Sequence, residues 1–171
     1  DPLLIDKGPT LERVVGALRA RKPGYPDVLE SLDDAGLEAL RGLYRAEAGR
    51  CLDGRRGALI VDKLPLRFMH AGLINRLFPD ARILFSLRHP CDTVLSNFMQ
   101  AYAATEASIH FDTLQGSVAM YVRTMSLWRG IEERLPLRLH YTRHEDQVAD
   151  PRAEMAQVCA FLGIEPVAAM P

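Results

Sequence analysis

The sequence predicts an α/β fold in which a parallel β-sheet carries helices on both faces, giving a three-layer structure. Short, continuous apolar runs recur along the chain, and their length is that of buried strands rather than of helices. Segments with helical spacing of apolar residues separate these runs. Strands that alternate with helices form parallel sheets covered on both sides. The expected strands are residues 58–61, 83–87 and 137–141.

Helical segments are expected between and around these strands. Each has apolar residues three or four positions apart and a recognisable start or stop. Asp112 is the expected N-cap of one long helix. In the last helix Asp150 is the N-cap, Pro151 the first helical residue and Gly163 the residue that ends it. The segments are residues 10–21, 33–52, 67–78, 90–104, the long helix after Asp112, and 151–162.

Composition limits the classes of protein to consider. The 171 residues are 48% hydrophobic and 25% charged, as in a globular protein, and we expect one domain over residues 1–171. The formal net charge of −1 argues against a nucleic-acid partner. No stretch approaches the ~20 apolar residues of a membrane helix. Three isolated cysteines and five histidines without ligand spacing indicate no metal site and a reducing, cytoplasmic location.

The residues that follow the expected strands are the candidates for a site, because parallel sheets bind ligands at the carboxyl ends of their strands. Arg88 follows one strand, and Pro90 then opens a helix that contains Ser96. This place combines a guanidinium group with free backbone N–H groups and the positive end of the helix dipole, which suits an anion. The alternative is that Arg88 pairs with Asp92 and Ser96 faces solvent or a neighbouring helix.

Lys63 also follows a strand, where its charge would offset negative charge that develops during group transfer. The alternative is an exposed lysine paired with Asp62. Glu145 and Asp146 follow the third strand and would serve in acid–base chemistry, or else as a cap or salt-bridge partners. A glycine-rich phosphate loop, normally present when a group is transferred from a nucleotide, does not occur in the sequence.

Residues 83–98, Ile-Leu-Phe-Ser-Leu-Arg-His-Pro-Cys-Asp-Thr-Val-Leu-Ser-Asn-Phe, resemble a signature of sulfotransferases that use 3′-phosphoadenosine 5′-phosphosulfate (PAPS). The similarity spans residues 25–166 and is greatest to bacterial, tetratricopeptide-linked or tyrosylprotein-type members. It implies that Arg88 and Ser96 hold the 3′-phosphate of PAPS and that Lys63 approaches the transferred sulfuryl group. Residues 143–146 resemble the family's Arg-Tyr-Glu-Asp, with His144 in place of the tyrosine near the adenine ring.

The resemblance further implies a P-loop nucleotide-hydrolase-like fold that is incomplete at both ends. The family's 5′-phosphosulfate loop, the acidic residue after it and a later C-terminal loop have no counterpart in these residues. We therefore expect this chain alone to be inactive and the parent protein, with possible fused tetratricopeptide repeats, to be the enzyme. It would move a sulfuryl group from PAPS, without a metal, to a hydroxyl or amine acceptor.

The acceptor is a small molecule, a carbohydrate or a protein side chain, and residues 103–111 form the loop expected to reach it. Two other functions stay open at this point. One is a non-catalytic α/β interaction module, and the other is a nucleotide-dependent phosphotransferase.

Overall fold

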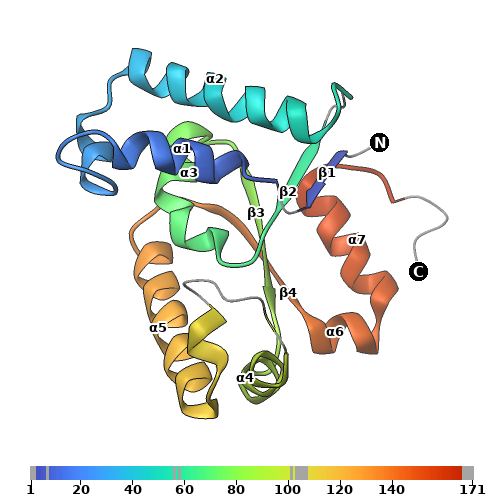
Figure 1. Ribbon diagram of the computed structural model, residues 1–171. Coiled ribbons are helices and arrows are strands. Elements are labelled where there is room, and N and C mark those ends of the chain that lie inside the picture. The colour runs from blue at the N-terminus through green and yellow to red at the C-terminus, as the bar shows by residue number, and fades with distance from the viewer. Residues whose placement is uncertain are drawn as a thin grey trace. The chain divides into compact units, whose positions relative to one another are not determined.

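In the described part of the chain, four short strands form two parallel pairs, one in each of two units, Asp1–Pro79 and Asp80–Pro171. The computed structural model describes residues 3–6, 8–55, 57, 59–100, 102 and 108–166. Each unit has its own helices (Figure 1). The single domain expected from the sequence stays a prediction.

The strands of the first unit are β1 (Leu3–Asp6) and β2 (Ile60–Lys63). They pair in parallel register, from Leu3 opposite Ile60 to Asp6 opposite Lys63. The sequence did not predict β1, because its apolar run is only three residues long. It predicted β2 two residues too early, at 58–61, and Ala58 lies outside the described residues.

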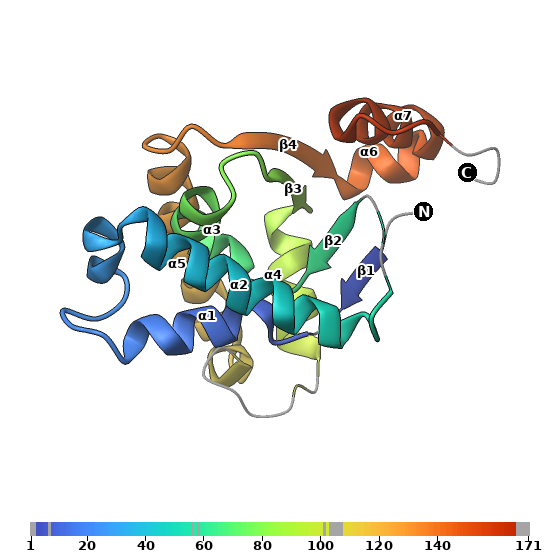
Figure 2. The same ribbon diagram turned by 90° about the horizontal axis from the view of Figure 1, so that it is seen from above.

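The helices of this unit pack around an aliphatic core. Helices α1 (Thr10–Arg19), α2 (Asp34–Cys51) and α3 (Ala71–Leu77) supply most of the core, and α1 and α2 lie side by side (Figure 2). Short 3-10 helices, Asp27–Ser31 and Arg67–His70, precede α2 and α3, so the segment expected as one helix over 67–78 begins as a 3-10 turn. Ile5 of β1 packs against Ala48 and Leu52 in and after α2, which ties the strand pair to the helices.

The strands of the second unit are β3 (Arg82–Leu87) and β4 (Arg138–Arg143), paired in parallel register along their whole length. Helix α5 (Leu114–Glu132) covers one face, where Trp128 stacks on Phe85 with ring centroids 4.3 Å apart. Helix α7 (Pro151–Leu162) covers the other face, where Phe161 stacks on His140 at 5.3 Å.

Phe85 lies opposite Tyr141, the residue next to His140, and neighbouring residues of a strand face opposite sides. The two ring contacts therefore define a helix layer on each side of the strand pair. Figure 1 shows α5 and α7 on opposite sides of β3 and β4. The α/β class with parallel strands is confirmed, and this unit has the expected sequence of layers.

Several boundaries differ from the prediction. Helix α4 (Pro90–Met99) ends before residue 104, and residues 103–104 lie outside the described part of the chain. The N-cap of α5 is Thr113, whose hydroxyl accepts a hydrogen bond from the Gly116 N–H, rather than Asp112. Asp150 and Gly163 cap α7 as predicted. Strand β4 continues two residues past its expected end at residue 141, to Arg143, and helix α6 (His144–Ala149) begins directly after it.

None of the helices described is both long enough and apolar enough to cross a membrane.

Candidate active site

The carboxyl ends of β3 and β4 bring two strand-to-helix turns together. The strands remain paired up to Leu87 and Arg143, after which the chain turns into α4 and α6. The backbone N–H of His89, in the first turn, donates a hydrogen bond of 2.8 Å to a carboxylate oxygen of Glu145 in the second. Arg88 and His144, two predicted site residues, therefore lie in turns that are joined to each other.

The Arg88 side chain lies along α4. Its Nε is 3.6 Å from the carboxylate of Asp92, and the two side chains are 46% and 54% exposed. Asp92 and Ser96 are four residues apart in the helix and so share one side of it. Arg88, Asp92 and half-buried Ser96 thus follow one side of α4. The Arg88–Asp92 pair considered as an alternative is present, but an exposed pair of this kind is weak enough to be exchanged for another anion.

The free N–H groups predicted at the start of α4 are largely occupied, and that part of the prediction is wrong. The Glu145 carboxylate accepts a hydrogen bond from the N–H of His89. The His89 ring nitrogen Nδ1 accepts one from the N–H of Cys91 at 3.3 Å. Pro90 has no N–H. The protein's own groups cap the helix end, so the predicted anion site would have to lie along the side of α4, with Arg88 and Ser96.

The surroundings of Glu145 favour its negatively charged form. Hydrogen bonds from its own backbone N–H and from that of His89 lower the pKa of its carboxyl group, and the nearby positive charges of Arg143 and His144 add to this effect. His144 is the first residue of α6 and is exposed. Its predicted contact with adenine stays a prediction.

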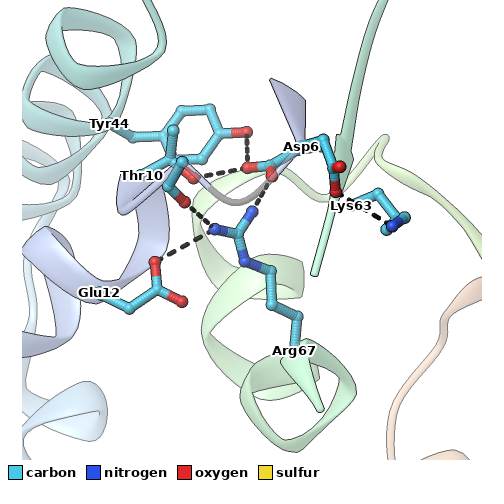
Figure 3. Close-up of polar contacts among 8 residues, drawn as sticks. Asp6, Thr10, Glu12, Tyr44, Lys63 and Arg67 are labelled. Carbon is cyan, nitrogen blue, oxygen red and sulfur yellow. Dashed lines mark hydrogen bonds and ion pairs between the residues drawn. The ribbon is translucent and has the colours of Figure 1, made fainter. Parts of the chain in front are cut away.

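Lys63 ends β2 in the other unit. Its ammonium nitrogen is 3.0 Å from a carboxylate oxygen of Asp6, the residue opposite it at the end of β1 (Figure 3). The alternative that Lys63 pairs with Asp62 is wrong, because adjacent residues of a strand face opposite sides. Since Lys63 and Arg88 belong to separate units, their shared cleft stays a prediction.

Asp62 anchors the end of β2 from the inside. Its carboxylate accepts hydrogen bonds from Thr10 (2.7 Å) and Tyr44 (2.8 Å) and forms an ion pair with Arg67. Arg67, almost fully buried, also pairs with Glu12 at 3.1 Å (Figure 3). Burial raises the pKa of the Tyr44 hydroxyl, which keeps it protonated as a donor. The strand that ends in Lys63 is therefore rigidly held one residue before it.

Sequence reasoning missed Asp6 and the partners of Asp62. Asp6 belongs to the strand that was not predicted, and Thr10, Tyr44 and Arg67 come from three separate segments. It also left open the role of Glu145. Among the described residues, no group of three or more His, Cys, Asp or Glu side chains is arranged to hold a metal ion.

The second unit, with its layers and the polar turns at the ends of β3 and β4, has the design of α/β proteins that bind a ligand beyond the carboxyl ends of parallel strands. The chain belongs to the sulfotransferase family, whose sequence model matches residues 6–168. A solved structure, the sulfotransferase domain from the curacin biosynthetic pathway, resembles it with a TM-score of 0.51. The match covers 82% of this chain and 53% of that one, at 21% identity, and shows a shared fold.

An uncharacterized protein of Aquifex aeolicus (strain VF5) is 31% identical over 87 residues. That match covers 51% of this chain and 11% of the relative. The chain thus spans about half of the solved sulfotransferase domain and a small part of the curated relative.

Proposed function

We propose that the protein is a PAPS-dependent sulfotransferase of the cytoplasm, which moves a sulfuryl group to a hydroxyl or amine. The observation that supports this most directly is the line of Arg88, Asp92 and Ser96 along one side of α4, in a chain of the sulfotransferase family. In the reaction, the acceptor oxygen or nitrogen attacks sulfur in line. The bond from sulfur to the 5′-phosphate oxygen breaks, a base takes the acceptor's proton, and adenosine 3′,5′-bisphosphate leaves.

Arg88 and Ser96 would hold the 3′-phosphate. The guanidinium group would leave Asp92 and donate two parallel hydrogen bonds to phosphate oxygens. Its planar shape matches the oxygens of a phosphate as well as those of a carboxylate. The Ser96 hydroxyl, two turns along α4, would donate a further bond. The exposed pair with Asp92 costs little to break, so the site is suited to exchanging one anion for another.

Lys63 would act on the reacting atoms. As the sulfur–oxygen bond breaks, negative charge gathers on the bridging oxygen, and an ammonium group beside it lowers the barrier. The anchored Asp62 would support this role by fixing the strand that presents Lys63. His144 would lie near the adenine ring.

Nucleotide selectivity tests the proposal. Titration calorimetry on the full-length protein should show tighter binding of adenosine 3′,5′-bisphosphate than of adenosine 5′-phosphate, which lacks the 3′-phosphate. Arg88→Ala should remove most of this difference. Arg123→Ala, which removes an exposed arginine from the middle of α5, is the matched control and should leave it unchanged. Preference for ATP would indicate a phosphotransferase instead, and binding of none of these nucleotides would indicate an interaction module.

A further inference from the structure

The peptide group between Arg88 and His89 is held at both of its polar atoms. Its carbonyl oxygen, from Arg88, accepts a hydrogen bond from the Thr93 hydroxyl at 3.5 Å. Its N–H, from His89, donates to Glu145 at 2.8 Å. Because a peptide group is planar, fixing these two atoms fixes the orientation of the whole group.

This peptide lies where Arg88 leaves the strand. Residue pairing in the sheet ends one position earlier, at Leu87 opposite Arg143, and α4 begins two positions later, at Pro90. Neither the strand ladder nor the helix therefore fixes the backbone of Arg88 by itself. The orientation of the 88–89 peptide sets the direction in which the Arg88 side chain leaves the chain.

We propose that Glu145, assisted by Thr93, is a positioning residue that directs Arg88 along the side of α4 toward the 3′-phosphate. The proposal rests on the function proposed above. Glu145 reaches the peptide from the opposite turn: it lies in the first turn of α6, and its carboxylate accepts the His89 N–H at 2.8 Å. The arrangement couples Glu145 to the direction of Arg88, which lies 57 positions earlier in the sequence.

The charge of Glu145 opposes the proposed ligand, and this makes the inference testable. A carboxylate near a phosphate site repels the phosphate. If only charge mattered, removing the carboxylate would tighten binding. If the hydrogen bond to His89 directs Arg88, removing the carboxylate will weaken binding despite the lost repulsion.

The experiment measures affinities for adenosine 3′,5′-bisphosphate and adenosine 5′-phosphate by titration calorimetry. Glu145→Ala should weaken binding of the bisphosphate about fivefold, the worth of one ordinary hydrogen bond, and leave adenosine 5′-phosphate unaffected. Glu145→Gln keeps an oxygen that accepts the His89 N–H and should bind the bisphosphate at least as well as the wild type. Asp146→Ala removes the same charge from the next position of α6 and should not weaken binding.

Coupling to Arg88 separates positioning from a general effect on structure. Glu145→Ala should cause no further loss of bisphosphate affinity in an Arg88→Ala protein. Thr93→Val, which keeps the shape of the side chain and removes its hydroxyl, should weaken bisphosphate binding about twofold. Thermal melting would show whether Glu145→Ala folds. If it does not, Thr93→Val still tests whether the 88–89 peptide directs Arg88.

The outcomes distinguish this inference from the proposed function. A wild-type protein that binds both nucleotides equally would contradict the function. The inference alone would be overturned if Arg88→Ala lost selectivity while Glu145→Ala bound the bisphosphate as tightly as the wild type. If Glu145→Ala does not fold, wild-type binding by Thr93→Val would overturn it in the same way. Equal weakening for both nucleotides in Glu145→Ala would also overturn it, because a directed Arg88 affects only the 3′-phosphate.

Discussion

Replacing Arg88 is the most informative perturbation of the proposed nucleotide site. The gain on binding is a charge-assisted contact with phosphate, about 1.5–3 kcal/mol for such a hydrogen bond. The cost is the Arg88–Asp92 pair, which at 3.6 Å and about half exposed is worth no more than about 1 kcal/mol. Arg88 is proposed to form two such bonds, so the gain exceeds the cost by about 2 kcal/mol or more. Arg88→Ala should therefore weaken bisphosphate binding about tenfold or more.

Two further variants make the series specific. Ser96→Ala removes a neutral hydroxyl and should cost about 1 kcal/mol, which is less than the loss of Arg88. Arg88→Lys keeps the charge but cannot form two parallel hydrogen bonds, and it should recover only part of the lost affinity. Titration calorimetry with adenosine 3′,5′-bisphosphate measures all three. If Arg88→Ala bound the bisphosphate as tightly as the wild type, Arg88 would be a structural partner of Asp92 and the reasoning would fail.

Three more predictions concern the first unit. Lys63→Ala should lower kcat for sulfuryl transfer at least tenfold and change bisphosphate affinity little, since the ammonium is proposed to act on charge that develops during the reaction; a change in affinity alone would contradict this. Asp62→Asn should lower the free energy of unfolding by about 3 kcal/mol in urea titrations, because it leaves buried Arg67 without a full counter-charge, and an unchanged midpoint would refute the anchoring role. Burial lowers the pKa of His70 below its ordinary 6.5, so the unfolded chain takes up the proton first and stability should decline as the pH falls below about 6.5. His70→Asn should flatten this dependence in unfolding curves at pH 7.5 and 5.5.

Local sequence patterns were sufficient for most elements of the second unit. The runs that became β3 and β4 are apolar enough to read as buried strands, and Asp150, Pro151 and Gly163 mark the ends of α7 through their backbone preferences. The cap of α5 was misplaced by one residue because Asp112 and Thr113 are both good N-caps, and only the bond to Gly116 distinguishes them.

Long-range pairing accounts for what the sequence did not reveal. The stability of β1 depends on β2, more than fifty residues away, and no local periodicity records that partner. The bond between Glu145 and His89 likewise requires the register that places Leu87 opposite Arg143. The partner of Lys63 was a different kind of error. Alternation along a strand already excludes a contact with its neighbour Asp62, so the sequence held a signal that was not applied.

The capped start of α4 changes which interaction must provide selectivity for the 3′-phosphate. At an open helix end, backbone N–H groups and the helix dipole bind a phosphate even when a nearby side chain is removed. Here Glu145 takes the N–H of His89 and places a negative charge at that end, which offsets the dipole. The remaining attraction comes mainly from Arg88, since the Ser96 hydroxyl is neutral. Loss of Arg88 should therefore bring the affinity for adenosine 3′,5′-bisphosphate close to that for adenosine 5′-phosphate. Retention of a large difference between them in Arg88→Ala would mean that other groups hold the 3′-phosphate.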